Sequence, residues 1–179
     1  MRVTSPGWTA SDNLPLKDFR PVRITGRSEI FRPMPRLKKS FHIKARDFIR
    51  AGEASINVQN LLKSMDFDPR LIRRVAICGY ESEMNVVMHG GDGTLSIEVD
   101  EQKLVLEIID DGPGIEDIEL AMQAGYSTAN DDHREMGFGA GMGLPNMKKN
   151  SDHIQIESPK NQGTAVRMVF FIPEKGKTN

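Results

Sequence analysis

Three short motifs follow one another in a fixed order along this chain of 179 residues. Glu81-Ser-Glu-Met-Asn85 lies inside a pattern of helical period, Asp110-Asp-Gly-Pro-Gly114 ends an apolar run, and Gly137-Phe-Gly-Ala-Gly-Met-Gly143 precedes a second helical pattern. The pair Gly163-Thr164 then stands between two runs of strand character. Each motif alone is common, but their order restricts the chain to folds that place a helix, a strand end and a glycine loop together.

Hydrophobic periodicity and punctuating residues predict the element order β-α-α-β-β-α-α-β-β. The clearest element is a helix from Pro69 to about His89, because Asp68 before a proline is a strong helix start and Gly90 a stop. The other expected elements are strands over 40–47, 94–99, 104–109, 153–157 and 164–172, and helices over 48–64, 115–123 and 144–151. We therefore expect an α+β fold, a two-layer sandwich whose mixed sheet carries helices on one face.

The first two helices should bury one apolar side each. The expected buried residues are Ile56, Val58, Leu61, Leu62, Leu71, Ile72, Val75, Ile77 and Cys78. Because Cys78 is the only cysteine and has apolar neighbours, it should be a buried, inert thiol.

The composition, with 38% hydrophobic and 27% charged residues, is typical of one soluble globular domain. No apolar run is long enough to span a membrane and no secretory signal is evident, so a cytoplasmic protein is expected. We expect residues 1–39 to be a basic, proline-rich, disordered extension, 40–173 the folded domain and 174–179 a tail. Since the body is acidic, direct nucleic-acid binding is not expected, although a basic extension can also bind an acidic partner.

The spacing of Glu81, Asn85 and His89 places the three side chains on one stripe of a helix. An exposed polar stripe is the ordinary interpretation. The alternative is a magnesium-nucleotide site, in which the Asn85 amide oxygen binds the cation and Glu81 orients or deprotonates an attacking hydroxyl or water. Glu83 points in another direction, so Glu81 is favoured as the base.

Asp110 follows a buried strand, where a carboxylate can accept a hydrogen bond from an exocyclic amine such as that of adenine. Gly112 and Gly114 allow close approach that side chains would block. An ordinary Asp-Gly turn is the alternative explanation. Thr164 could share a water or the adenine edge with Asp110, although a β-branched residue in a strand needs no such role.

The alternating glycines at 137, 139, 141 and 143 stand just before a helix. Such loops expose backbone N–H groups, and the helix dipole adds positive potential, which suits phosphates. A dinucleotide-binding fold is disfavoured because its glycine motif follows the first strand of a βαβ unit, whereas this loop comes late. A flexible linker is the remaining alternative.

Taken together, the motifs resemble the Bergerat-fold GHKL ATPases, over about residues 40–173, and especially the small anti-sigma regulatory kinases of the RsbW, SpoIIAB and RsbT type. The resemblance implies a general base at Glu81, a Mg²⁺ ligand at Asn85 and an aspartate that recognises adenine at Asp110. It implies further nucleotide-binding positions at Gly112, Gly114, Gly139, Gly141, Gly143 and Thr164. It also implies an ATP lid over residues 124–138.

The function implied by this resemblance is that of an ATP- and Mg²⁺-dependent protein serine/threonine kinase in bacterial regulation, which phosphorylates a STAS-domain partner. The resemblance also allows a sigma factor or a phosphatase as partner, and a homodimer. The alternative is a non-catalytic, nucleotide-gated switch that binds a sigma factor or activates a phosphatase. An ATPase with mechanical output is disfavoured because no second domain follows.

Overall fold

The structure is a computed structural model that describes residues 37–128 and 139–173. The expectations for the N-terminal extension, for Gly137 with the end of the lid, and for the C-terminal tail therefore lie outside the described residues. The described elements follow the predicted order β-α-α-β-β-α-α-β-β. Their bounds are β1 Leu37–Ile43, α1 Glu53–Ser64, α2 Pro69–His89, β2 Gly93–Val99, β3 Lys103–Asp110, α3 Ile118–Ala121, α5 Gly143–Asn150, β4 His153–Glu157 and β5 Thr164–Phe171.

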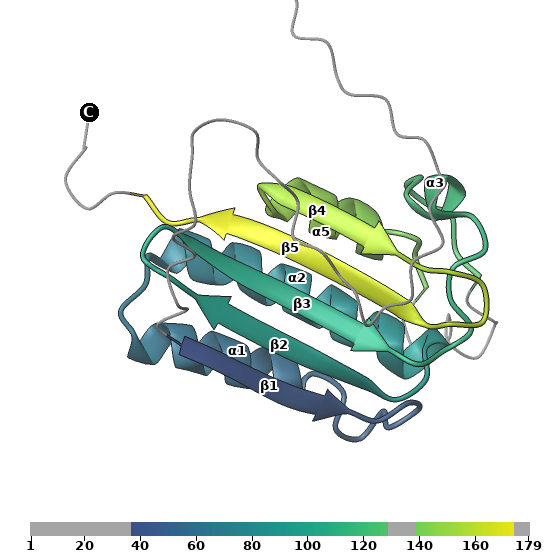
Figure 1. The fold of residues 1–179 in the computed structure, drawn as a ribbon, viewed down its shortest axis with the longest axis horizontal. Coiled ribbons are helices and arrows are strands. Elements are labelled where there is room, and N and C mark those ends of the chain that lie inside the picture. The colour runs from purple at the N-terminus through teal and green to yellow at the C-terminus, as the bar shows by residue number, and fades with distance from the viewer. Residues whose placement is uncertain (1–36, 129–138, 174–179) are drawn as a thin grey trace, which may run out of the picture. The chain divides into compact units, whose positions relative to one another are not determined.

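The five strands form one sheet in the order β1-β2-β3-β5-β4, and every neighbouring pair is antiparallel (Figure 1). The α+β architecture is thus confirmed, but the expectation of a mixed sheet is wrong. After β3 the chain passes through α3 and α5 and returns in β4 at the edge of the sheet. The turn from β4 to β5 then inserts β5 beside β3, so that β4 and β3, which run in the same direction, never pair.

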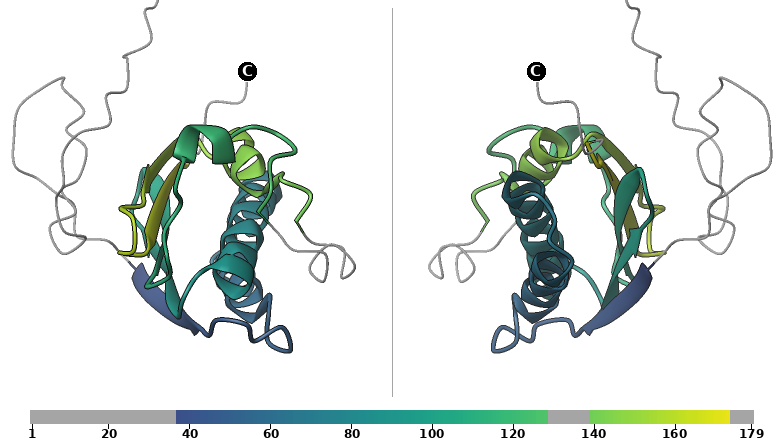
Figure 2. Two further views of the ribbon diagram at one scale, coloured as in Figure 1. Left: turned by 90° about the vertical axis from the view of Figure 1, so that its right-hand side faces the viewer. Right: turned by 90° about the vertical axis from the view of Figure 1, so that its left-hand side faces the viewer.

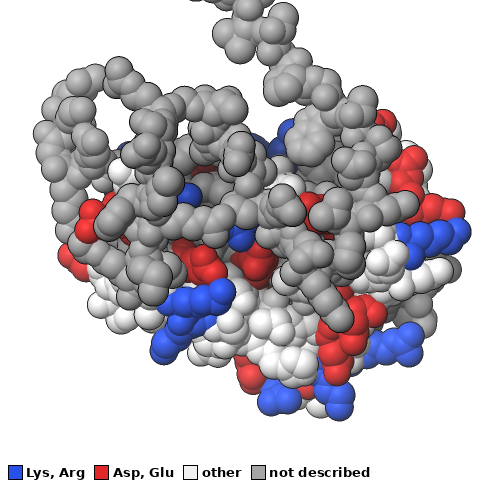
Figure 3. Space-filling view, in the orientation of Figure 1, with Lys and Arg blue, Asp and Glu red and all other residues white. Residues whose placement is uncertain are grey.

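Helices α1, α2 and α5 cover one face of the sheet, which makes two layers (Figure 2). The core between the layers is apolar, and it contains the fully buried side chains of Val58, Leu62, Val75, Leu95, Ile97, Leu104, Leu106, Met147, Met168 and Phe170. On the face of the sheet opposite these helices, cross-strand ion pairs join Lys38 to Glu98 at 2.6 Å and Arg167 to Glu107 at 2.8 Å. Figure 3 shows positive and negative side chains interspersed among the described residues on this side.

Helix α2 begins at Pro69 as predicted, because the Asp68 side chain accepts a hydrogen bond from the Arg70 backbone N–H at 2.7 Å. Strand β1 begins at Leu37, inside the segment expected as extension. Helix α1 begins at Glu53, later than the predicted residue 48. The cause of this later start is a residue of α2, Glu83, which is distant from α1 in the sequence.

The carboxylate of Glu83, which is only 2% exposed, caps the N-terminus of α1. Its Oε1 accepts from the Ala54 N–H at 3.1 Å and its Oε2 from the Ser55 N–H at 2.8 Å. A buried carboxylate needs such donors, and a helix N-terminus supplies unpaired N–H groups. Glu83 therefore has a structural role that explains why it points away from Glu81.

Three of the residues expected in the core are not fully buried, and of these Leu61 still packs against the core. Ile56 is 55% exposed, because Val58 faces the core and a spacing of two residues turns Ile56 about 200° away. Ile77 is only partly buried for the same reason, since Val75 faces inward. The expectation for Cys78 is confirmed: it is fully buried, and burial raises the pKa of its thiol to about 12. Among the described helices, none is long and apolar enough to cross a membrane.

Candidate nucleotide site

The first and third motifs meet where α2 faces the first turn of α5. Glu81 and Asn85 lie one turn apart on α2, and both side chains point toward Gly143. A Cβ added to Gly143 would lie 3.3 Å from Asn85 Oδ1 and 3.5 Å from Glu81 Oε2. The last glycine of the loop thus leaves a small space beside an amide oxygen and a carboxylate. Both can bind a cation, and the carboxylate can also accept a proton.

Asn146 is a residue of this site that the sequence analysis missed. Its Nδ2 donates a hydrogen bond to Glu81 Oε1 at 2.7 Å, which connects α5 to α2. Because Asn146 lies three residues after Gly143, both lie on one side of α5. This spacing could have identified Asn146 from the sequence, because it places an amide one turn into the helix that follows a glycine loop. The bond fixes the orientation of the Glu81 carboxylate relative to the loop.

A second group of residues surrounds Asp110 at the end of β3. Its Oδ1 accepts from the Gly112 N–H at 2.8 Å, and Asp110 pairs in register with Thr164 of β5. Burial raises the pKa of the Asp110 carboxyl above its ordinary value, while the N–H groups of Gly112, Gly91 and Thr164 act in the opposite direction. The result is a partly desolvated acceptor at the strand end, held by backbone donors.

Gly112 requires its lack of a side chain for a steric reason. A Cβ there would lie 2.5 Å from the backbone N of Gly91 and 2.7 Å from Gly90, where α2 ends. This close approach brings the second motif against the helix that carries the first. Three further predicted glycines adopt left-handed backbone conformations, with φ of 82° at Gly114, 78° at Gly139 and 69° at Gly141.

Thr164 is nearly buried, and its hydroxyl lies 3.0 Å from the hydroxyl of Ser158. Ser158 also accepts from the Ile115 N–H at 2.6 Å, next to Gly114. Thr164 therefore contacts Asp110 through its backbone N–H, and its hydroxyl connects β5 to the second motif through Ser158. Ser158 is a further contact that no local pattern indicated.

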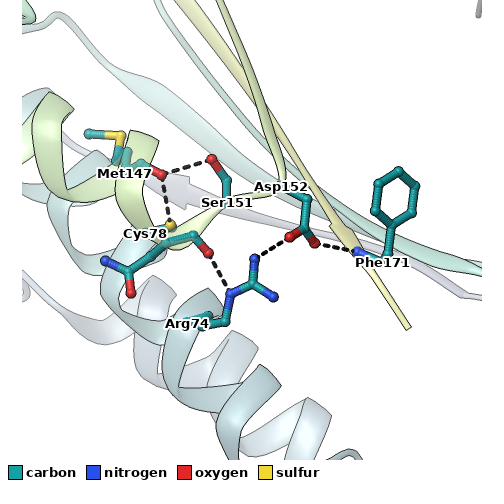
Figure 4. A network of polar contacts seen from close by, with 7 residues as sticks. Arg74, Cys78, Met147, Ser151, Asp152 and Phe171 are labelled. Carbon is teal, nitrogen blue, oxygen red and sulfur yellow. Dashed lines mark hydrogen bonds and ion pairs between the residues drawn. The ribbon is translucent and has the colours of Figure 1, made fainter. Parts of the chain in front are cut away.

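A polar network holds α5 against α2 and the sheet (Figure 4). Arg74 Nε donates to the Asn150 carbonyl at 2.8 Å, and Arg74 Nη2 to Asp152 Oδ1 at 2.7 Å. The other carboxylate oxygen of Asp152 accepts from the Phe171 N–H at 2.7 Å. Burial opposes ionisation of Asp152, but the Phe171 N–H and Arg74 together lower its pKa below the ordinary value. This network fixes the position of α5 and therefore supports the contact between Asn146 and Glu81.

Within the ranges that the structure describes, no group of three or more His, Cys, Asp or Glu side chains could hold a metal ion. A cation beside Asn85 would therefore need further oxygen ligands from a bound substrate and water. Mg²⁺ is the ion that usually binds in this way, through one or two protein oxygens and substrate phosphates. The oxygen donors beside Gly143 fit such an ion.

The described geometry combines a carboxylate and amide on a central helix, a carboxylate at a strand end and glycines before a second helix. The family model for histidine kinase-, DNA gyrase B- and HSP90-like ATPases matches residues 79–175. This chain belongs to that family.

Its curated relatives include regulatory proteins of bacteria. The anti-sigma F factor of Thermoanaerobacter sp. (strain X514) is 36% identical over 96 residues, which are 54% of this chain and 59% of that protein. The serine/threonine-protein kinase RsbT of Bacillus subtilis (strain 168) is 31% identical over 118 residues, 64% of this chain and 83% of that protein. The chain spans about three fifths of the length of the first curated relatives that it matches.

Among solved structures, the SiaB-SiaC complex from Pseudomonas aeruginosa contains a chain of similar fold. The TM-score is 0.52 at 14% sequence identity, over 74% of this chain and 88% of that one. At this identity the likeness concerns the fold alone. It agrees with the two-layer α+β architecture described above.

Proposed function

We propose that this chain binds Mg-ATP at the site described above and acts as an anti-sigma-type protein serine/threonine kinase on a STAS-domain partner. The observation that carries the proposal is the Glu81 carboxylate, held by Asn146 and placed beside Asn85 and Gly143. A proton acceptor and an amide oxygen that face the first turn of α5 are suited to the transfer of a γ-phosphoryl group to a hydroxyl. The relatives named anti-sigma F factor and RsbT support the same class.

The second motif would bind the base of the nucleotide. In this proposal Asp110 accepts a hydrogen bond from the exocyclic amine of adenine, and the close contact of Gly112 with Gly90 and Gly91 holds the second motif against the end of α2. The backbone N–H groups of Gly139, Gly141 and Gly143 bind phosphate oxygens, aided by the dipole of α5. Thr164 keeps β5 in register with Asp110.

The residues Asn85 and Glu81 would lie at the γ-phosphate, where the reaction takes place. Asn85 would hold Mg²⁺, which offsets negative charge on the phosphates when it is bound. Glu81 accepts the proton of a partner's Ser or Thr hydroxyl while that oxygen bonds to the γ-phosphorus. The bond between the γ-phosphorus and the oxygen that bridges to the β-phosphorus breaks, and ADP leaves.

The proposal is tested by transfer of label from γ-labelled ATP with Mg²⁺ to STAS-domain proteins purified from the same organism. Label on a partner serine or threonine, dependent on Mg²⁺, is the expected result. ATP binding without transfer to any of these proteins would reject the kinase.

One observation favours the alternative, a nucleotide-gated switch that binds a sigma factor or activates a phosphatase. The Gly125 N–H donates to the Gly141 carbonyl at 3.0 Å, so the first residues of the predicted lid are attached to the glycine loop. Phosphates bound to the glycine loop would then alter the conformation of the attached segment and the protein surface that it forms. In this case ATP should alter partner affinity without any labelled product.

Replacing Asp110 with asparagine should weaken ATP binding about tenfold, because a charge-assisted hydrogen bond becomes a neutral one. The same change should stabilise the protein without nucleotide at neutral pH. Since burial raises the folded-state pKa, wild-type stability falls as pH rises above the ordinary value of 3.8, and the asparagine variant lacks this loss. Thermal unfolding between pH 4 and 8 checks this. A stability difference of constant size across that range would contradict it.

Replacing Asn146 with aspartate should shift the pH dependence of phosphoryl transfer to higher pH. The new carboxylate would replace a donor that lies 2.7 Å from Glu81 Oε1, and two carboxylates so close share one proton. At neutral pH the rate should fall about tenfold and recover partly in alkaline buffer. Rates measured from pH 6 to 9, with thermal unfolding beside them, distinguish this from simple destabilisation. An unshifted profile would make Asn146 only a structural residue.

A further inference from the structure

A groove of about 600 Å³ runs between α1 and α2 and ends at the candidate base. Glu81 is one of its lining residues, so the groove and the nucleotide site share a side chain. Its floor is apolar and is made by one stripe of α2, with Ile72, Ala76, Ile77 and Tyr80. From Pro69 to Glu81 the stripe is about 18 Å long, at 1.5 Å for each residue of helix.

Apolar side chains along this groove are exposed to solvent or only partly buried. Tyr80 is 44% exposed, and Ile77 is only partly buried. Ile56, which is 55% exposed, lies on the stripe of α1 that also carries Gln59 and Lys63. Contiguous exposed apolar residues with a polar rim are typical of a protein interaction surface.

The rim of the groove carries two positive charges, on Lys63 and Arg73. In the part of the chain that the structure describes, neither Lys63 nor Arg73 has an ion-pair partner. The neighbouring arginines of α2 differ, since Arg70 pairs with Asp68 and Arg74 with Asp152. A partner that covers the groove therefore needs carboxylates opposite these two cations.

We propose that this groove docks a helical segment of the phosphoacceptor protein, apolar on the side toward Ile77 and Tyr80 and acidic toward Lys63 and Arg73. The inference rests on the proposed kinase function and specifies its partner surface. A helix of three turns matches the length of the groove. Because the groove ends at Glu81, a segment bound there brings the rest of its protein up to the candidate base.

The first test does not depend on catalysis. The probe is a fluorescein-labelled, stapled 12-residue helix with leucines on one side and glutamates on the other, and its counterpart carries lysines in place of the glutamates. The full-length protein should bind the acidic probe at least about tenfold more tightly than the basic one. Arg73→Glu should reverse that preference, and Ala76→Arg should abolish binding by filling the floor. Lys39→Glu, an exposed charge change on β1, is the matched control and should bind like wild type.

Several outcomes would overturn the docking surface. They are absence of binding, equal binding of both probes, or loss of binding in the Lys39 variant as well. A second copy of this chain in the groove would also overturn it, and would appear as a dimer that Ala76→Arg dissociates. Thermal unfolding of each variant confirms that it folds.

The second test uses a STAS-domain protein that wild type phosphorylates. Arg73→Glu and Ala76→Arg should lower kcat/KM for that protein at least about tenfold and leave KM for ATP within a factor of about two. If wild type labels the partner and these variants label it equally, the docking surface is wrong and the kinase stands. If no partner is labelled but the acidic probe binds as described, the kinase is wrong, and the groove stands as a docking surface for an acidic amphipathic helix of another protein.

Discussion

Replacing Glu81 with glutamine should lower the rate of phosphoryl transfer by a factor of about 10²–10⁴, the usual contribution of a general base. Glutamine keeps the size of the side chain, and its carbonyl can still accept the hydrogen bond from Asn146. It cannot accept a proton from the attacking hydroxyl. ATP affinity should therefore stay within a factor of about three, because the nucleotide contacts are made by other residues. Initial rates with γ-labelled ATP and a fluorescent ATP-binding assay measure the two quantities.

The matched control is Glu83→Gln, the same substitution two residues along the same helix. Glu83 accepts from two backbone N–H groups at the start of α1, and one of them would face the donating amide of glutamine. We expect a loss of about 1–3 kcal/mol in the free energy of unfolding, with transfer per folded molecule unchanged. If Glu83→Gln removed transfer while Glu81→Gln did not, the base would be assigned wrongly.

The sequence predicted those parts of the fold that local chemistry determines. Helix α2 starts at Pro69 because Asp68 caps it, and strand β4 lies where the alternation of residues 153–157 placed it. The sequence also predicted which motifs would lie near each other. Glu81 and Asn85 do face Gly143, and Asp110 does pair with Thr164. The functional roles of these residues remain predictions until the variants are measured.

The features that were missed depend on contacts between distant segments. The antiparallel sheet follows from the edge position of β4, which no single strand encodes. The start of α1 depends on Glu83, far along the chain, and the bond from Asn146 to Glu81 joins α5 to α2. The exposure of Ile56 and Ile77 depends on how each helix is rotated against the sheet. Hydrophobic periodicity identifies the apolar side of a helix but does not determine which residues at the border of that side are buried.

Replacing Gly163 with alanine should strongly destabilise the protein, because the added Cβ would overlap the backbone of Asp110. The backbone φ of Gly163 is +83°, and a Cβ there would lie 2.0 Å from the backbone oxygen of Asp110. That oxygen belongs to the paired ends of β3 and β5 and cannot move without opening the register between Asp110 and Thr164. We expect a loss of about 3–5 kcal/mol in the free energy of unfolding, and a loss of ATP binding because Asp110 is displaced.

Gly125 provides a control that separates backbone strain from steric overlap. Its φ of +88° is nearly that of Gly163, yet a Cβ added to it would meet nothing within 4 Å. Gly125→Ala should therefore cost only the left-handed conformation itself, about 1–2 kcal/mol. Urea unfolding of the two variants beside wild type gives both values. The difference between them measures how tightly the turn at Gly163 is packed on the strand that carries Asp110. Equal destabilisation would mean that this packing adds nothing to the free energy of unfolding.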